Sequence, residues 1–521
     1  MMRKIALLLV FALLLPVFAG CDSETAYVPT GNGLADDTHP VDVPQVTAPG
    51  SLEQQEQFFT LAWYSEQGLN PYLCTNINNR MLFSLLYQGL FSVDRDYQAV
   101  PILCKSLKVS EDLKEFTIYL ESATFSDGSY LRAEDVVASL NYASESAMYE
   151  GRFHRIRSVE AISENAIRIT TTTPYENLPM LLDIPILKAS ELEAAIPAGT
   201  GPYMAQQTAS GMALLRCKNW WCSAELPITA ASIPLVEAVS TARIRDQFEF
   251  ADLGLSISDP GAASYAEYRC DYELWEIETG LFLYLCCNME SDVFSNMRVR
   301  EALTYGIDRT AILQQCYNGF GVTSTLAVSP NSPFYDRGLG NKGVYDPELF
   351  RQAVKDQGML GKEVVLLVNK SDSVRVQAAR KVITMLENAG LTVVLEDWST
   401  SYYREKLKTD EWDLYLGQTK LSPTMDLGQF FAPYGALSYG DLDDAACYSM
   451  AADALENSGN YYNLHQLIQA DGQLVPILFR TYGVYAKRGL MNYLTPARDN
   501  VFFYTLGKEL ADVMTIVFDD E

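Results

Sequence analysis

The sequence predicts a protein of the mixed α/β class. From Gln57 onward, short apolar runs alternate with stretches whose apolar residues recur at helical spacing. The segment 363–398 shows this most clearly, because it reads as a strand, a helix and a second strand. Two strands joined through one helix pair in parallel with a right-handed crossover. The 521 residues exceed what one hydrophobic core supports, so two or three domains are expected.

The strand–helix–strand unit is defined by its apolar runs and its helix ends. Residues 364–368 form an apolar run typical of a buried strand, and residues 391–395 begin the second strand. Ser371 or Ser373 can cap the helix, and Gly390 stands just after its end, where a left-handed backbone is common. The helix presents one apolar stripe, formed by Val374, Ala378, Val382, Met385 and Leu386.

Shorter elements are expected elsewhere in the chain. A helical pattern begins at Met81 and ends at Gly89, and Glu134 and Asp135 lie in the first turn of another helix, where the helix dipole favours acids. The Asp127-Gly128 pair marks a turn. The expected strands are 58–63, 116–120, 166–171 and 281–287, and the expected helices are 81–89 and 133–142.

Residues 1–21 predict export. Two positive charges precede an apolar run at 5–18, which at 1.5 Å per residue covers about 21 Å and falls short of the roughly 30 Å core of a bilayer. The run closes on small residues before Cys21, and the segment from Phe18 to Cys21 resembles the bacterial lipoprotein box, although Phe18 replaces the usual Leu. We expect Cys21 to be the lipidated N-terminus. The alternative is an ordinary signal peptide with a chance cysteine.

The next segment, 22–55, predicts a flexible acidic stalk. It is rich in Pro, Gly and acids and has little apolar periodicity, so it cannot bury enough surface to offset the entropy of ordering. His39 falls in this stalk, while His154 and His465 lie far away in the sequence. Three scattered histidines give no metal-ligand spacing, so we expect neither a metal site nor a cofactor.

The composition and motifs exclude several function classes. The chain has 39 basic and 66 acidic side chains and a net charge of -27, which repels nucleic acid and anionic lipid headgroups. It lacks the GxSxG, HExxH and P-loop motifs, so an enzyme is not expected. No CxxC pair supports a zinc site. Cys217 and Cys222 are the nearest candidates for a disulfide, although free thiols fit the sequence equally well.

Several short stretches, in order, carry a resemblance to a known family. They are 85–91 (LLYQGLF), 125–128 (FSDG), 133–136 (AEDV), 199–203 (GTGPY), 219–221 (NWW), 299–303 (VREAL), 307–309 (IDR), 464–467 (LHQL) and 475–479 (VPILF). Together they resemble the family 5 extracellular solute-binding proteins, the peptide and oligopeptide receptors of ABC importers. Each stretch taken alone also fits a turn, a helix cap or a core segment, so these landmarks indicate the fold without marking the binding site.

The resemblance implies an α/β, two-lobed periplasmic-binding-protein-like fold (type II, cluster C) with an extra inserted domain. The expected parts are a discontinuous lobe I at 56–75, 185–268 and 480–521, an inserted domain II at 76–184, and a lobe III at 269–479.

In function, the resemblance implies a receptor whose two lobes close on a peptide and deliver it to an ABC importer permease. The ligand's backbone groups pair with protein strands while its side chains enter hydrated pockets. We expect a monomer, tethered by lipid to the outer face of the cytoplasmic membrane, or in the periplasm where an outer membrane is present. Two alternatives remain open: a receptor of the same fold for an oligosaccharide, a metal chelate or a pheromone peptide, and a sensing lipoprotein without transport.

The resemblance also suggests where a ligand binds. In many family members a strand of the second lobe runs into a Gly-Trp segment followed by an aspartate that pairs with the ligand's amino group. Here the strand ends at Gly417, Gln418 replaces the Trp, and the usual acid is displaced or absent. We hypothesise that Asp426 takes this role; its alternative is a cap of the following short helix. The other candidates are Asp413, Gln418, Thr419 and Tyr439.

Overall fold

The computed structural model describes residues 60–238, 253–259, 272–409 and 411–518. All of these belong to one compact unit, Gln45–Glu521. The predicted signal segment, Cys21 and the stalk therefore lie outside the described residues. Within the described ranges, no helix is both long and apolar enough to cross a membrane.

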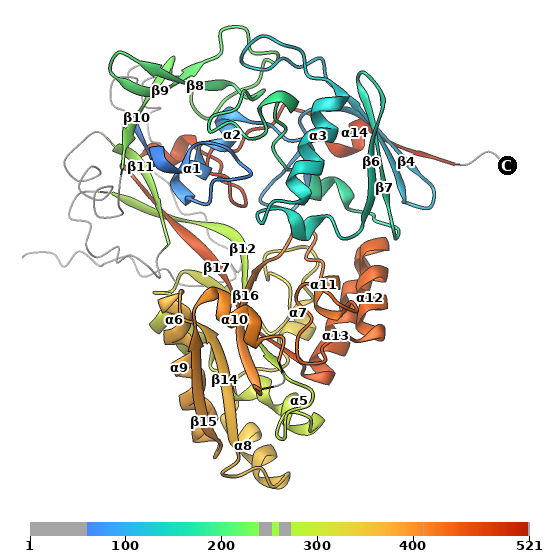
Figure 1. The fold of residues 1–521 in the computed structure, drawn as a ribbon, viewed down its shortest axis with the longest axis vertical. Helices are drawn as coiled ribbons and strands as arrows, with labels where there is room; N and C mark the ends of the chain where they lie inside the picture. Colours follow the sequence, from blue (N-terminus) through green and yellow to red (C-terminus); the bar gives the residue numbers. More distant parts are fainter. Residues whose placement is uncertain (1–59, 239–252, 260–271, 410, 519–521) are drawn as a thin grey trace, which may run out of the picture. The chain divides into compact units, whose positions relative to one another are not determined.

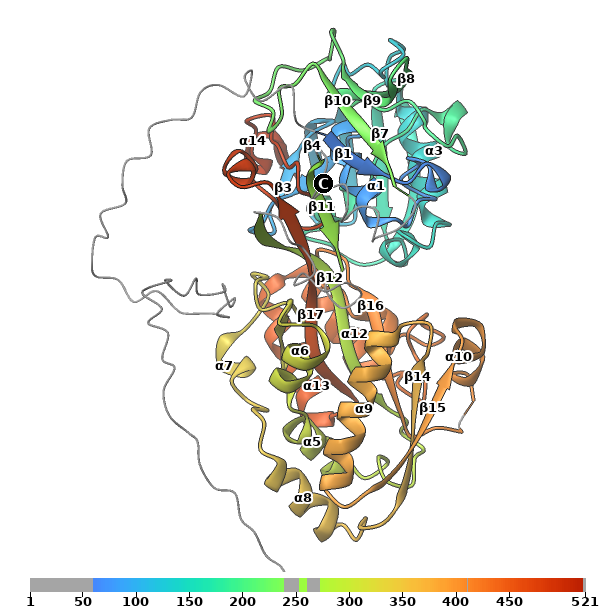
Figure 2. The same cartoon turned by 90° about the vertical axis from the view of Figure 1, so that its left-hand side faces the viewer.

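The largest element is an 11-stranded mixed sheet held together by two long antiparallel strands, β12 and β17. These two strands run from the half of the sheet that contains β1 to the half that contains β14 (Figures 1 and 2). In order across the sheet the strands are β15 (Thr392–Trp398), β14 (Glu363–Asn369), β16 (Leu414–Lys420), β12 (Glu273–Cys287), β17 (Leu474–Ala486), β11 (Leu253–Ser258), β1 (Thr60–Trp63), β10 (Ser232–Glu237), β9 (Gly211–Arg216) and β8 (Tyr203–Thr208), while β13 (Gly321–Thr323) pairs with β17.

A second sheet of five strands lies in the region 104–171 and takes its edge strand from the C-terminal end of the chain. That edge strand, β18 (Met514–Val517), pairs in parallel with β4 (Cys104–Ser110). The remaining strands of this second sheet are β5 (Glu115–Leu120), β7 (Ala166–Thr171) and β6 (Ile156–Ser163), and the helix α3 (Ala133–Ser144) packs against the sheet. A separate hairpin joins β2 (Phe91–Val93) to β3 (Ala99–Pro101).

The predicted strand–helix–strand unit is confirmed. Strands β14 and β15 pair in parallel, with Val364 opposite Val393, and α9 (Ser373–Asn388) connects them. Gly390 has a φ of +97°, as expected after a helix end. The cap prediction was wrong, because Asp372 accepts the hydrogen bond from the Arg375 amide at 3.0 Å, in place of Ser371 or Ser373. A carboxylate is an equally good cap, and Asp372 directly precedes the helix.

The helix predicted at 81–89 is instead two short helices, α1 (Ile77–Met81) and α2 (Phe83–Leu86). The first begins earlier than predicted because Asn76 accepts hydrogen bonds from the amides of Asn78 and Asn79. Gly89 follows in a crowded position, where an added Cβ atom lies 2.8 Å from the carbonyl oxygen of Phe91. These residues form the floor of the site described below.

Several of the remaining helices pack around β12, β14, β16 and β17, whereas α14 (Leu510–Val513) packs against β3, β4 and β18. A core that includes Leu285, Leu366, Val382 and Leu416 lies between these strands and their helices. Every cysteine in the described ranges is a free thiol, Cys217 and Cys222 included. The helices are α5 (Met297–Gly306), α6 (Arg309–Cys316), α7 (Arg337–Gly340), α8 (Pro347–Asp356), α10 (Thr400–Lys406), α11 (Gly428–Phe431), α12 (Ala445–Glu456), α13 (Tyr461–Asp471) and α14 (Leu510–Val513).

Candidate functional site

Two adjoining cavities lie where β16 ends against the region 80–159. The first, which we call the small chamber, has a volume of about 130 Å³ and is walled by residues from α1 and α2, from 149–152 and from 498–504. The second, which we call the large chamber, has a volume of about 700 Å³ and lies between residues 141–159 and the segment 419–437. Tyr149, Arg152 and Lys420 line both chambers, so the two adjoin each other at these residues.

The shared residues are positioned by two short pieces of backbone. Lys420 is the last residue of β16 and lies opposite Leu281 of β12, so the central sheet fixes where its side chain begins. Tyr149 directly precedes the short 3-10 helix η3 (Glu150–Arg152), Arg152 is its last residue, and the Arg152 guanidinium lies 5.3 Å from the centroid of the Tyr149 ring. Arg152 also donates a hydrogen bond to the Leu181 carbonyl oxygen at 3.2 Å. The wall between the chambers is therefore held by the backbone on both sides.

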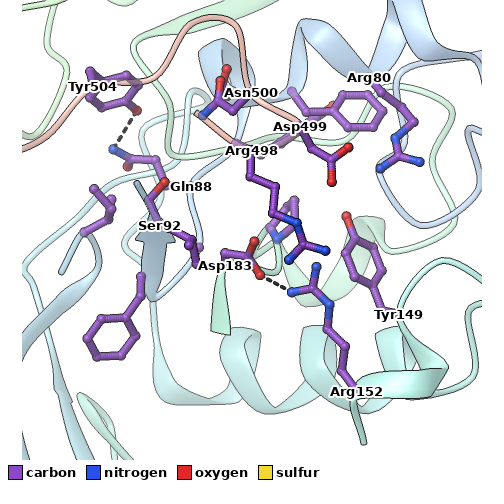
Figure 3. Close-up of a pocket in the computed structure, with 18 of the residues that line it drawn as sticks. Arg80, Gln88, Ser92, Tyr149, Arg152, Asp183, Arg498, Asp499, Asn500 and Tyr504 are labelled. Atoms are coloured by element: carbon purple, nitrogen blue, oxygen red, sulfur yellow. Dashed lines mark hydrogen bonds and ion pairs between the residues drawn. The ribbon is translucent and has the colours of Figure 1, made fainter. Parts of the chain in front are cut away.

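Charged side chains dominate the small chamber. Its lining includes the cations Arg80, Arg152, Lys420 and Arg498 and the acids Asp183 and Asp499. Figure 3 shows the guanidinium groups of the three arginines directed into the same space. Arg152 pairs with Asp183, and the Lys420 ammonium lies 2.5 Å from an Asp499 carboxylate oxygen.

The electrostatics of the small chamber depend on burial. Burial, together with the charges of Arg80 and Arg498, lowers the pKa of Lys420 to about 8 against the opposing effect of Asp499. Burial alone raises the pKa of Asp499, but Lys420 and the two arginines outweigh it and hold that pKa below its ordinary value. Asp499 also has a φ of +56°, and its amide donates to the Glu278 carbonyl oxygen at 2.8 Å. The backbone thus turns sharply where the pair is held.

Asp426 lies outside both chambers in a buried ion pair. One of its carboxylate oxygens lies 2.8 Å from His154 Nε2 and 3.9 Å from Arg155 Nε, and its side chain is 4% exposed. The other oxygen accepts the Gly428 amide at 2.7 Å, at the first residue of α11. Burial raises the pKa of Asp426, but the charges of His154 and Arg155 outweigh it and lower that pKa. Both oxygens therefore have partners within the chain.

The other predicted residues lie along β16 or beyond it. Asp413 precedes the strand, accepts the Val365 amide at 2.7 Å and is seven residues, or about 23 Å, from Lys420 at the other end. Gln418 accepts a hydrogen bond from Arg480 at 2.9 Å. The Tyr439 ring packs edge-on against another tyrosine at 6.1 Å, whereas Thr419 lines the large chamber. The roles of these four residues in ligand binding stay predictions.

The residues that define the small chamber were missed from the sequence. They come from positions 80, 152, 183, 420 and 498–499, which no local pattern connects. The one available signal was Lys420, because a lysine stands at the end of the strand, where the family resemblance leads one to look for an acid.

One group of potential metal ligands occurs in the described part of the chain. Atoms of Asp444, Cys447 and Asp471 lie within 4.8 Å of one another. Asp444 already caps α12 by accepting the Cys447 amide at 2.6 Å. Burial and the two acids raise the pKa of the Cys447 thiol, which opposes the thiolate that a metal requires. Helix capping accounts for this group.

Comparison with known proteins places the fold in a family. Residues 98–439 match the model of the bacterial extracellular solute-binding proteins, family 5 Middle. The glutathione-binding protein GsiB of Escherichia coli K12 is 24% identical over 316 residues, which are 56% of this chain and 59% of that protein. The chain thus spans about three-fifths of the length of this relative.

Solved structures share the architecture at low identity. NikA from Brucella suis in complex with Fe(III)-EDTA superposes with a TM-score of 0.67 at 18% identity, covering 82% of this chain and 95% of that one. The oligopeptide-binding protein AppA from Bacillus subtilis in complex with a nonapeptide gives a TM-score of 0.60 at 18% identity, covering 82% and 94%. The two-lobed type II fold is confirmed, and the chain belongs to the bacterial extracellular solute-binding proteins of family 5.

Proposed function

We propose that this protein is a membrane-tethered receptor that captures short peptides in the two chambers and delivers them to an ABC importer permease. The family consists of binding receptors without enzymatic activity. The observation that carries the proposal is the pair of adjoining chambers, the larger of which, at about 700 Å³, falls within the usual range of small-molecule pockets, about 300–1,000 Å³.

Peptides are the proposed class because of the site's shape and because of the proteins it resembles. Two chambers that meet at Tyr149 and Arg152 suit a ligand with a compact end and a longer remainder. GsiB is named for binding glutathione, and the AppA structure contains a nonapeptide. Polar and charged walls can also satisfy the ligand's backbone groups, which closure removes from water.

The lobes predicted from the resemblance supply the closing motion in this proposal. The walls of the site come from 80–159 on one side and from 419–437 on the other, and β12 and β17 are the long strands that link the halves of the central sheet. We propose bending of these strands as the hinge, with domain II at 76–184 and lobe III at 269–479. A lipid on Cys21 keeps the receptor close to its permease.

Asp426 remains our predicted partner for a ligand's amino group. An ammonium that binds it must displace His154, which lies at 2.8 Å, or enter beside it. His154 also lines the large chamber, so in this proposal His154 and Asp426 both lie next to the bound ligand. N-acetylated peptides test this contact directly, because acetylation removes the ammonium charge and leaves the rest of the ligand intact.

The test of the proposed function is mass spectrometry of the ligand that stays bound through gentle purification of the full-length protein. We expect short peptides, and adding them back to ligand-free protein should raise its unfolding midpoint. A Thr419→Trp variant, which fills part of the large chamber, should lose the ligand. Recovery of a sugar or a chelate, or retention of the peptide by Thr419→Trp, contradicts the proposal.

A further inference from the structure

The small chamber has a charge opposite to that of the chain. The protein carries a net charge of -27, yet the chamber is lined by four cationic and two acidic side chains, which leaves a surplus of two positive charges. In a chain with 66 acids and 39 bases, chance alone favours an acidic lining. Gathering buried cations also costs solvation free energy, so their presence calls for a negative partner.

Two of the four cations are already neutralised inside the protein. Asp183 pairs with Arg152, and Asp499 pairs with Lys420. Arg80 and Arg498 have no carboxylate within ion-pair distance among the described residues, and they supply the surplus.

The contacts that these two arginines do make are weak or incomplete. Arg80 donates to the Met148 sulfur at 3.8 Å, which is a poor acceptor. Arg498 donates through Nη2 to the Leu421 carbonyl oxygen, while its Nε is buried without a hydrogen-bond partner in the described structure. Ser84 Oγ, on the same wall, is likewise buried without a partner. The chamber is therefore lined by residues whose hydrogen-bonding capacity is only partly used within the described chain.

We propose that the small chamber binds two carboxylates of an acidic ligand, such as a short peptide that ends in Asp or Glu, through Arg80 and Arg498. This inference rests on the proposed function and names the ligand class of the same site. Arginine forks suit carboxylates because both are planar and can form two parallel hydrogen bonds. In this proposal protein cations bind the acidic end of the ligand. This contact differs from the one proposed for Asp426, in which a protein carboxylate binds the ligand's amino group.

The size of the chamber supports this assignment. A volume of about 130 Å³ leaves room for on the order of ten water-sized probes, at about 10–15 Å³ each. Two carboxylates joined by a short carbon chain fit in a space of this size, and a longer peptide extends beyond it. The remainder of the ligand extends past Tyr149 and Arg152 into the large chamber.

Lys420 adds a pH signature to the binding. Its pKa is lowered to about 8 by burial and by the neighbouring arginines, and a bound carboxylate opposes both arginine charges and raises that pKa. The charged groups that face Lys420 are Asp499, Arg80 and Arg498, and cations hold the pKa of Asp499 below its ordinary value, so Lys420 is the group expected to change charge near pH 8. Acidic ligands should therefore bind with proton uptake near pH 8 and should bind more weakly above it.

The experiment is calorimetric titration of the full-length, ligand-free protein with Gly-Gly-Glu and with its diamide, Gly-Gly-Gln-NH₂, which has nearly the same shape. We expect the acid to bind at least tenfold more tightly than the diamide. Arg80→Gln and Arg498→Gln should each reduce this preference at least tenfold, because glutamine keeps donors but removes the charge. Arg216→Gln is the matched control, since Arg216 is exposed and also donates to one backbone carbonyl.

Further probes separate the sources of negative charge and the two proposals. Glutarate and inorganic phosphate, tested by their effect on the unfolding midpoint, distinguish a dicarboxylate site from a phosphate site. Equal binding of acid and diamide, a stronger effect of phosphate, or no effect of any anion overturns the carboxylate assignment. If the carboxylate assignment fails but the wild type binds Gly-Gly-Gln-NH₂ and Thr419→Trp does not, the proposed function still stands. If Arg80→Gln unfolds, Arg80→Lys, which keeps the charge, should retain most of the preference.

Discussion

At the scale of single residues, Asp426 and Asp499 each form an ion pair that joins two segments of the chain at the site. Asp426 is buried and Asp499 is partly buried, and the pKa of each carboxylate is lowered by cations from another part of the chain. Asp499 joins the C-terminal segment to the last residue of β16 through Lys420. Asp426 joins the segment before α11 to His154 and Arg155. In both places one carboxylate connects two walls of the site.

The Asp426 pair leads to a prediction about stability. Asp426→Asn keeps an oxygen for the Gly428 amide but leaves Arg155, whose side chain is 3% exposed, without its counter-charge. Breaking one side of a buried pair costs about 3–5 kcal/mol, so the ligand-free unfolding midpoint in urea should fall clearly. Asp346→Asn is the control, because Asp346 is an exposed helix cap.

The same variant separates two roles for Asp426. If Asp426 also anchors the ligand, peptide affinity falls at least a hundredfold together with the ligand-free midpoint. If the ion pair is chiefly structural, the midpoint falls and free and N-acetylated peptides bind alike. A stable variant with unchanged peptide affinity contradicts both roles.

At the scale of elements, α9 shows what determines a helix start. Asp372 lies between two serines that are both acceptable caps by residue type, and only the backbone conformation selects among them. Its φ of -108° and ψ of 96° are extended, and its carboxylate accepts from Arg375, three residues on. The carboxylate also lies 3.1 Å from the Arg375 guanidinium, which adds a local ion pair.

We predict that Asp372→Ala lowers the free energy of unfolding by about 1 kcal/mol, within the usual range of about 0.5–2 for a lost cap. Ser371→Ala and Ser373→Ala should change it much less, because neither side chain caps the helix. Urea unfolding of the three variants, followed by circular dichroism, measures the differences. A larger loss in either serine variant than in Asp372→Ala contradicts this cap assignment.

The elements also show which parts of the molecule the sequence could predict. The unit from β14 to β15 was correct because its apolar stripe, strand runs and Gly390 are all local signals. The helix at 81–89 was placed wrongly because Asn76, a cap just upstream, starts the first helix early and Leu82 separates it from the second. Local patterns record propensity, but they do not record where neighbouring elements interrupt it.

The site could not be predicted for a different reason. Its small chamber joins Arg80 to Arg498, which are more than four hundred positions apart in the printed sequence. The helix α1, which carries Arg80, packs on β1 and β11, and β11 pairs with β17, the strand that precedes the Arg498 segment. Asp426 and Asp413 were predicted as ligand-binding residues from their distance to β16 along the chain. That distance does not determine whether a side chain lines the cavity.

At the scale of the whole molecule, β12 and β17 connect everything that the site requires. Strand β16, which carries Lys420, pairs with β12, and β11, which leads toward β1, pairs with β17. The register between β12 and β17 shifts between Glu278 and Leu281, and Gly280 within this shift has a φ of +69°. An irregularity of this kind bends a strand and increases its twist. The central sheet is therefore bent close to the residues that line the small chamber.

This geometry predicts a measurable closure when ligand binds. Burial of the ligand and of the facing walls should give a negative change in heat capacity, and the unfolding midpoint should rise with ligand concentration. At a ligand concentration of about 100 times Kd, the stabilisation should reach about 2.7 kcal/mol. The peptide identified by mass spectrometry serves as the ligand, and the radius of gyration from X-ray scattering should fall on saturation.

The Gly280→Ala variant tests whether the bend in β12 takes part in that closure. An added Cβ atom lies 1.7 Å from Arg498 Nη2, so the guanidinium must leave its place in the small chamber, and the positive φ adds strain. We expect weaker binding and a smaller decrease in the radius of gyration on ligand addition. Gly128→Ala is the matched control, because Gly128 also has a positive φ, of +87°, but its Cβ position meets no atom within 4 Å. If Gly280→Ala and Gly128→Ala bind peptide and close alike, the bend in β12 neither positions Arg498 nor contributes to closure.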